Sequence, residues 1–231
     1  MRAEESRKSP GESPWLEEIA FFNDAEPHGA ALNMAIDEAL LAAATMPVLR
    51  VYRWARPAVS FGYFERWEPI RAAYPGREPV RRWTGGGIVL HGEDLTYSLV
   101  VPQNILGGVS ASDSYSVIHR ALRAALRDAG IRATTAAGTC AKVSQACFEN
   151  PVMHDVLVNG GKVAGAAQRR TRAGLLHQGS VQGLGLTLEF GELLAARLAK
   201  NILDQSFDIT DVATKLIAEK YGNERWLKMR M

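Results

Sequence analysis

The stretch CFENPVMHDVLVNGGKVAGAAQRR, residues 147 to 170, decides how the fold is interpreted. Its Asn-Gly pair at 159–160 lies between two apolar runs and predicts a hairpin over 154–170, because both residues tolerate positive φ. The turn places Lys162 at the start of the returning strand. Cys147, one of only two cysteines in the chain, precedes the hairpin. Hairpin geometry would allow the cysteine and the lysine to reach one pocket.

Strands and helices alternate around this hairpin in an order typical of an α+β fold. The patterns predict strands within 18–22, 48–54, 58–64, 79–102, 131–137 and 175–190, and helices over 29–45, 112–129, 191–203 and 210–221. In the first helix an apolar stripe lies opposite Asp37 and Glu38. Because strands dominate the middle and helices flank them, we expect α+β architecture with a central, mainly antiparallel or mixed β-sheet.

The composition indicates one globular domain. Of 231 residues, 47% are hydrophobic and 23% charged, and the net charge of +2 is too small to indicate nucleic-acid or membrane binding. The polar segment 1–14 is predicted to be a disordered leader and 15–231 a single domain. No apolar run matches a signal peptide or a membrane span, which predicts a soluble, cytoplasmic protein.

The cysteines and the basic clusters have ordinary interpretations. Cys140 and Cys147 are spaced C-x6-C with no matching Cys/His pair downstream, so we expect no metal site. Cys140 is interpreted as a buried residue at a strand end. Two arginine clusters are either solvated edges or a landing surface for an acidic partner. Their members are Arg77, Arg81 and Arg82, and Arg169, Arg170 and Arg172.

The segment RRWTGGGIVLH, residues 81 to 91, is the first candidate binding element. Three glycines between strands are most simply a tight bend. The alternative is that the missing side chains let a ligand lie against free backbone N–H groups. His91 is interpreted as a core histidine or a residue at the pocket rim. Phosphate-loop, dinucleotide-binding and nucleophile-elbow motifs are absent from the sequence.

The second candidate element pairs Cys147 with Lys162. A cysteine is usually a small buried hydrophobe, but a neighbouring lysine would stabilise its nucleophilic thiolate. The same ammonium could then hold the oxyanion of an acyl intermediate. The small residues of GGKVAGAA leave room for a ligand around the lysine stem, and Val163 is expected to point to the core.

Together these segments resemble the lipoate–protein ligase and octanoyltransferase superfamily, whose catalytic domain is shared with biotin protein ligases. The resemblance covers about residues 15 to 185. It rests on NMAIDEALL, RVYRWARPAVSFGYFE, RRWTGGGIVLHGEDLTYSLVVP, HDVLVNGGKVAGAAQRR and LLHQGSVQ, which occur in the family's order. It implies a biotin/lipoate-ligase-like catalytic domain. The residues after LLHQGSVQ are too few for the C-terminal accessory domain of many ligases, so none is expected.

The block ACFENP, residues 146 to 151, resembles the cysteine loop of octanoyltransferases that use acyl carrier protein. The resemblance implies that Cys147 is the nucleophile and Lys162 its partner. It implies substrate-binding roles for Arg82, Thr84, Gly85, Gly86, Gly87, His91, Gly165 and Ala166. The implied reaction moves octanoate from octanoyl-acyl carrier protein to a lysine of a lipoyl domain, such as glycine cleavage H protein. No cofactor is required, and a monomer is expected.

Two features of the sequence also match the ligase branch. The loop carries the triplet Gly85-Gly86-Gly87, where the nearest transferases usually have T-G-G-R, and Gly161 stands where a basic residue commonly precedes the lysine. The first alternative is therefore an ATP-dependent lipoate–protein ligase that forms lipoyl-AMP with ATP and Mg, leaving Cys147 without a role. The second is a non-catalytic acyl-binding domain.

Overall fold

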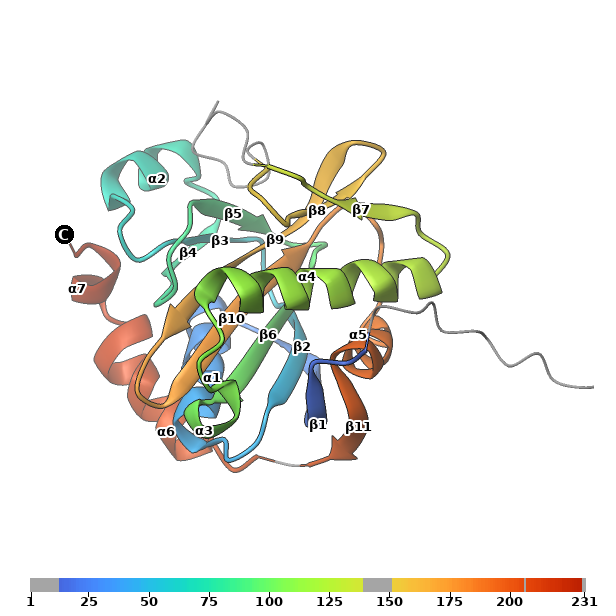
Figure 1. Cartoon of the computed structure of the whole chain (residues 1–231). Helices are drawn as coiled ribbons and strands as arrows, with labels where there is room; N and C mark the ends of the chain where they lie inside the picture. Colours follow the sequence, from blue (N-terminus) through green and yellow to red (C-terminus); the bar gives the residue numbers. More distant parts are fainter. Residues whose placement is uncertain (1–12, 139–150, 206, 230–231) are drawn as a thin grey trace, which may run out of the picture.

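A computed structural model describes residues 13–138, 151–205 and 207–229 (Figure 1). Its centre is an eight-stranded mixed sheet in the order β11-β1-β2-β6-β10-β9-β8-β7. β1 pairs in parallel with β11 and β2, and the remaining neighbours are antiparallel. The strands are β1 (Leu16–His28), β2 (Val48–Trp54), β6 (Leu95–Pro102), β7 (Ala133–Thr135), β8 (Val156–Val158), β9 (Gly161–Arg170), β10 (Gly174–Val181) and β11 (Ala199–Asp204). The predicted α+β class with a mixed sheet is confirmed.

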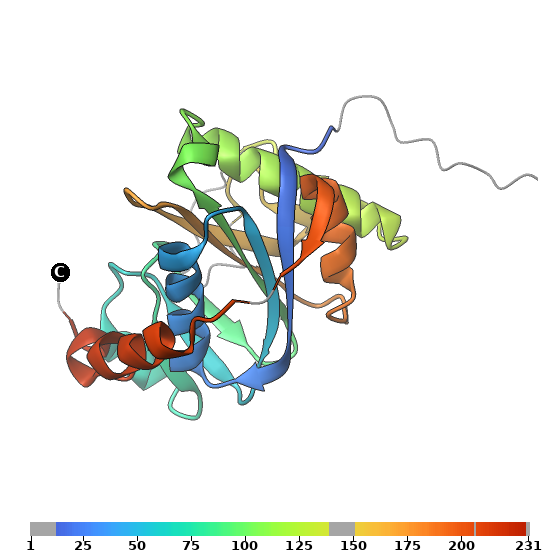
Figure 2. The ribbon, with the colours of Figure 1, turned by 90° about the horizontal axis from the view of Figure 1, so that it is seen from below.

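Helices cover both faces of this sheet (Figures 1 and 2). One face packs against α4 (Ala111–Asp128) and α5 (Phe190–Leu198). The other packs against α1 (Ala30–Ala43), α6 (Thr210–Leu216) and the π-helix Ile217–Tyr221. Strand β2 shows the period of two that makes this possible, because Leu49 and Val51 enter the first core and Val48 and Tyr52 the second.

A second, three-stranded sheet in the order β4-β3-β5 stands beside the first (Figure 1). Its strands are β3 (Ala58–Phe61), β4 (Glu78–Arg81) and β5 (Ile88–His91), and α2 (Trp67–Ala73) lies between β3 and β4 in the chain. The short helices α3 (Gln103–Leu106) and α7 (Glu224–Leu227) complete the fold. The glycine loop therefore connects two strands of the small sheet and faces the large one.

Most predicted elements form, but two in the C-terminal part of the chain have different bounds. The hairpin turns at Asn159 and Gly160, which both have positive φ, as predicted. The predicted strand over 175–190 ends at Val181, because the following loop has Gly183 and Gly185 at positive φ. The predicted helix over 191–203 ends at Leu198 and gives way to β11, whose backbone pairs with the edge of β1. Sheet pairing here overrides local helix propensity.

Asp37 was expected on the polar face of its helix, but it is fully buried. It lies against Arg50, which is also fully buried and donates to Asp37 Oδ1 at 2.7 Å and to Asp24 Oδ2 at 2.8 Å. Arg50 also donates to the side-chain oxygen of Asn33 at 2.7 Å. The expectation was wrong because the charge is neutralised inside the protein by an arginine from the neighbouring strand.

Arg81 and Arg82 do not form the predicted solvated edge or landing surface, because both are buried. Arg81 donates to the backbone carbonyls of Tyr63 and Glu65 and to those of Trp226, Leu227 and Met229. Its guanidinium thereby ties the C-terminal helix α7 to the small sheet. Five rigid N–H donors suit arginine for collecting carbonyl oxygens in this way.

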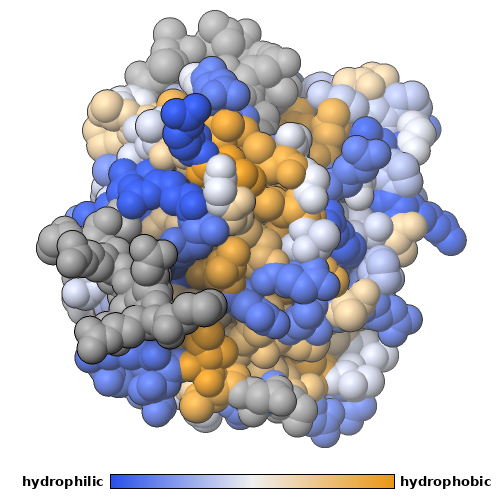
Figure 3. Space-filling model, turned by 90° about the vertical axis from the view of Figure 1, so that its right-hand side faces the viewer, coloured by the Kyte–Doolittle hydropathy of each residue, from blue (hydrophilic) through white to orange (hydrophobic). Residues whose placement is uncertain are grey.

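The face that carries β11 and α5 exposes apolar side chains (Figure 3). Ile202 and Leu203 of β11 and Leu193 of α5 are among the exposed large hydrophobic residues. Within residues 13–138, 151–205 and 207–229, no helix combines the length and the apolar character that crossing a membrane requires.

Replacing Arg50 tests the buried ion pairs. Arg50→Met leaves the carboxylates of Asp24 and Asp37 buried without their guanidinium, so we expect the free energy of unfolding to fall by about 3–5 kcal/mol. Urea denaturation measures this value. The control is Lys200→Ala, which breaks an exposed pair with Glu17 and should cost less than about 1 kcal/mol. Equal losses in the two variants would contradict the prediction.

Candidate functional site

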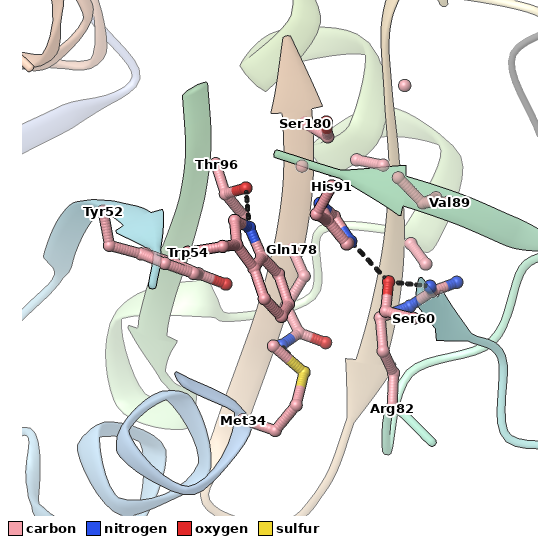
Figure 4. Close-up of a pocket in the computed structure, with 14 residues that line it drawn as sticks. Met34, Tyr52, Trp54, Ser60, Arg82, Val89, His91, Thr96, Gln178 and Ser180 are labelled. Carbon is pink, nitrogen blue, oxygen red and sulfur yellow. Dashed lines mark hydrogen bonds between the residues drawn. The ribbon is translucent and has the colours of Figure 1, made fainter. Parts of the chain in front are cut away.

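An apolar pocket lies between α1, β2, the small sheet and the strands β9 and β10 (Figure 4). It encloses about 430 Å³, part of it open to solvent. Its lining residues are Met34, Tyr52, Trp54, Ser60, Arg82, Val89, His91, Thr96, Gly165, Ala166, Ala167, Gln178, Gly179 and Ser180. The small lining residues, from Gly165 to Ala167 and at Gly179 and Ser180, come from β9 and β10.

The polar groups on one side of the pocket satisfy one another. Ser60 Oγ lies 2.6 Å from His91 Nε2, and His91 Nδ1 lies 2.7 Å from Asp94 Oδ2. Because Arg82 donates to Ser60 Oγ at 2.6 Å, the serine hydroxyl can donate to His91, whose Nδ1–H then donates to Asp94. Burial lowers the pKa of His91, so its ring is neutral at neutral pH. Trp54 stacks on this ring at 3.9 Å between centroids.

The polar groups on the opposite side are also paired. Gln178 Nε2 donates to Asp37 Oδ2 at 2.7 Å, and its Oε1 accepts from Thr84 Oγ1 at 2.7 Å. Trp54 Nε1 donates to Thr96 Oγ1 at 2.7 Å. These side chains therefore present their carbon atoms to the pocket, and the cavity suits an apolar ligand.

The glycine loop is held by Arg82 and fits closely over Gly62. Arg82 donates to the carbonyls of Gly85 and Gly87 at 3.1 and 2.9 Å. A Cβ on Gly62 would lie 1.9 Å from the carbonyl oxygen of Gly86, so no side chain fits beneath the loop. Gly86 itself has a φ of 83°, which favours glycine. The loop is thus a tight bend, the simpler of the two predicted interpretations, and it also borders a surface groove.

This groove lies next to the pocket, because Ala166 and Ala167 line both. Gly85 and Gly86 form one side of it. The other groove residues are Ala111, Ser112, Tyr115, Val152, Met153, His154 and Gln168. The glycine loop thus forms part of a surface groove beside the apolar pocket.

Lys162 lies beside the pocket wall and is almost completely buried. Its Nζ is 2.7 Å from Asp155 Oδ2, and the side chains are 2% and 0% exposed. A Cβ on Gly165 would come within 2.5 Å of Lys162 Cε and 2.7 Å of its Nζ. Gly165 is therefore the residue whose missing side chain leaves space for the lysine. Val163 packs against the core, as predicted.

A β-bulge explains how Lys162 and Gly165 come to share one side of β9. Val156 pairs with Ala164, but Leu157 pairs with Lys162, so β9 carries one extra residue at Val163. Residues three apart in a regular strand point to opposite faces. The extra residue reverses this alternation and aims the lysine under the glycine.

The structure thus brings several residues of the predicted site together. Arg82, His91, Gly165 and Ala166 line the pocket, Gly85 and Gly86 line the groove, Gly87 closes the loop and Thr84 fixes Gln178. Cys147 and Cys140 lie outside the described residues, so their predicted roles stay predictions. Sequence patterns did not single out Trp54, Ser60 or Gln178, which look like ordinary strand residues, and they gave Asp155 no role. In the described part of the chain, no three His, Cys, Asp or Glu side chains are grouped to hold a metal ion.

Two further histidines, His119 and His177, are buried, and the centroids of their rings lie 5.6 Å apart. His119 Nδ1 is 2.9 Å from the carbonyl oxygen of His154, and burial lowers the pKa of His119 to about 4. Burial also lowers the pKa of His177, well below its usual value. Together with His91 they form a set of three buried imidazoles that are neutral at neutral pH.

The chain matches the family model of the lipoyl protein ligase A/B catalytic domain over residues 29–197. It belongs to this family. An octanoyltransferase from Kyrpidia tusciae is 35% identical over 80% of this chain and 76% of its own length. One from Carboxydothermus hydrogenoformans is 40% identical over 69% of this chain and 63% of its own length. These relatives confirm the predicted acyltransferase class and support octanoyl transfer in protein lipoylation.

The fold agrees with the solved structure of a lipoate protein ligase. A bi-partite lipoate protein ligase from Thermoplasma acidophilum, solved with its E2 lipoyl domain, superposes with a TM-score of 0.71. The match covers 94% of this chain and 97% of that one, at 18% identity. The predicted lipoate-ligase-like fold is confirmed.

The buried histidines predict a loss of stability in mild acid. Below pH 6.5 the unfolded chain binds protons that the folded chain does not, so the free energy of unfolding falls until the native pKa is reached. For His119, a native pKa of about 4 corresponds to roughly 2 kcal/mol lost at pH 5.0 relative to pH 7.5. Urea denaturation at the two pH values measures this difference.

The control for this prediction is His119→Gln. In this variant the difference in unfolding free energy between pH 7.5 and pH 5.0 should be smaller by roughly 2 kcal/mol. Asp94 does not obscure the comparison. Burial favours its neutral form, but His91 lowers the pKa of Asp94 to about 2, so its stabilisation is lost only below about pH 4. Equal stability at pH 7.5 and pH 5.0 would refute the prediction.

Proposed function

We propose that this chain transfers an octanoyl group from octanoyl-acyl carrier protein to a lysine of a lipoyl domain through a thioester on Cys147. The observation that carries the proposal is the position of Lys162 beside Gly165, at the wall of an apolar pocket. The pocket would bind the acyl chain. The buried ammonium of Lys162 would stabilise the negative charge that develops on the carbonyl oxygen during transfer. Glycine cleavage H protein is an acceptor of the right kind.

The pocket favours a saturated chain. Each methylene group moved from water into it contributes about 0.8 kcal/mol. The hydrogen-bonding groups around it are already paired with one another, through Ser60, His91 and Gln178. A ligand that needed polar partners along its length would compete with these bonds. The hydrocarbon part of an octanoyl chain has no hydrogen-bonding groups, so it would leave these bonds intact.

The proposed reaction has two steps. In the first, the Cys147 thiolate attacks the carbonyl carbon of the donor thioester, the donor C–S bond breaks, and the carrier thiolate leaves and takes a proton. In the second, the neutral amine of the acceptor lysine attacks the Cys147 thioester, forms the amide and releases the Cys147 thiolate with the loss of one proton. Lys162 donates to the carbonyl oxygen in both tetrahedral intermediates. No nucleotide or metal is consumed.

Intact mass spectrometry tests this function. The protein is incubated with octanoyl-acyl carrier protein in the absence of ATP, and the reaction is quenched in acid. We expect one octanoyl adduct in the wild type and in Cys140→Ala, and none in Cys147→Ala. Transfer to a lipoyl domain that requires ATP and survives in Cys147→Ala would instead make the chain a ligase. Binding of octanoate without turnover under either condition would make it an acyl-binding domain.

A methyl group at Gly165 should displace Lys162. Gly165→Ala places a Cβ within 2.5 Å of Lys162 Cε, so we expect the rate of adduct formation to fall on the order of 100-fold. Quenched-flow measurement with octanoyl-acyl carrier protein gives this rate. Gly161→Ala is the matched control, because a Cβ there meets only the Val158 carbonyl oxygen, at 3.7 Å. Similar rates in the two variants would show that the lysine position is not critical.

A further inference from the structure

We propose that Asp155 and Tyr115 are positioning residues that hold Lys162 against the wall of the acyl pocket. The inference rests on the proposed function of Lys162 and adds two residues to which the sequence analysis gave no role. Neither residue needs to touch the substrate, since both act through the lysine. The argument depends on three successive contacts that lead from the ammonium group to the backbone of β9.

The first contact is the ion pair between Lys162 and Asp155. The 2.7 Å distance and the near-zero exposure of both side chains mean that water screens this pair very little. The carboxylate orients the amino group of Lys162, which can also donate a hydrogen bond to the carbonyl oxygen of a substrate. The pair therefore supports a role for Lys162 in holding negative charge.

The second contact fixes the carboxylate itself. Asp155 Oδ2 also accepts from the backbone N–H of Val152 at 2.8 Å, and Oδ1 accepts from the hydroxyl of Tyr115 at 2.6 Å. Asp155 is fully buried, so these bonds compensate for its lost hydration. With both oxygens engaged, the carboxylate has one orientation in which to receive the ammonium.

The third contact joins Tyr115 to the pocket wall. Its hydroxyl accepts from the backbone N–H of Ala166 at 3.1 Å while it donates to Asp155. Burial and the charge of Asp155 raise the pKa of Tyr115, so its hydroxyl keeps the proton that it donates. Ala166 lines the pocket. One hydroxyl from α4 therefore sets the distance between the pocket wall and the carboxylate that holds the lysine.

Tyr115→Phe removes only this hydroxyl, and Tyr97→Phe provides the matched control. The hydroxyl of Tyr97, like that of Tyr115, has a polar partner inside the protein, but the partner is His177 Nε2 at 3.3 Å and not Asp155. The two variants should therefore lose similar stability, as measured by urea denaturation. Only Tyr115→Phe should lower kcat for octanoyl transfer, by roughly tenfold, with an unchanged KM for octanoyl-acyl carrier protein.

A double-mutant cycle separates positioning from general structural support. If Tyr115 acts through Lys162, Tyr115→Phe should cause no further loss of rate in a Lys162→Gln background. The same loss in both backgrounds, or equal kcat values for Tyr115→Phe and Tyr97→Phe, would overturn the inference. A wild-type protein that makes no octanoyl product from the carrier would instead refute the proposed function. The cycle would then be measured in ATP-dependent lipoylation, where the same two outcomes decide the positioning role.

Discussion

The buried carboxylate of Asp37 is the interaction on which most of the structure depends. It accepts hydrogen bonds from Arg50, Tyr52, Ser98 and Gln178, which come from β2, β6 and β10. One side chain of α1 therefore joins the helix to three neighbouring strands of the large sheet. A charge in this position is tolerated only because donors surround it. The same donors fix how the strands lie under the helix.

This network extends from the core to the site. Gln178 donates to Asp37 and accepts from Thr84, which lies at the start of the glycine loop. These hydrogen bonds fix the start of the loop relative to α1. On the other side of the pocket, Asp94 orients His91 through a hydrogen bond, and His91 is bonded to Ser60. Arg82 donates to Ser60 and also to a carbonyl group of the glycine loop. The pocket is apolar inside because its polar side chains are turned toward one another. A cavity for a hydrocarbon chain is thus built from two polar networks that meet at one loop.

The sequence predicts the parts of the fold that depend on local chemistry. The Asn159–Gly160 turn follows from backbone freedom, and the helix of Ala111–Asp128 follows from its apolar spacing. The predictions fail where contacts with residues distant in the sequence determine burial or secondary structure. Charge patterning places Asp37 and Arg81 outside, but ion pairs and carbonyl groups from other elements bring them inside. Strand β11 exists because β1 offers an edge, which helical spacing over 191–203 does not reveal.

At the site, too, the sequence predicts the residue types but not how their side chains are oriented. Lys162 and Gly165 are three apart, and a regular strand would send their side chains to opposite faces of the sheet. The motif GGKVAGAA identifies small residues around a lysine, but nothing in it locates an extra residue at Val163. The extra residue lies where β9 pairs with the short strand β8, Val156–Val158. That register shift places the ammonium against Gly165, whose missing side chain leaves space for it.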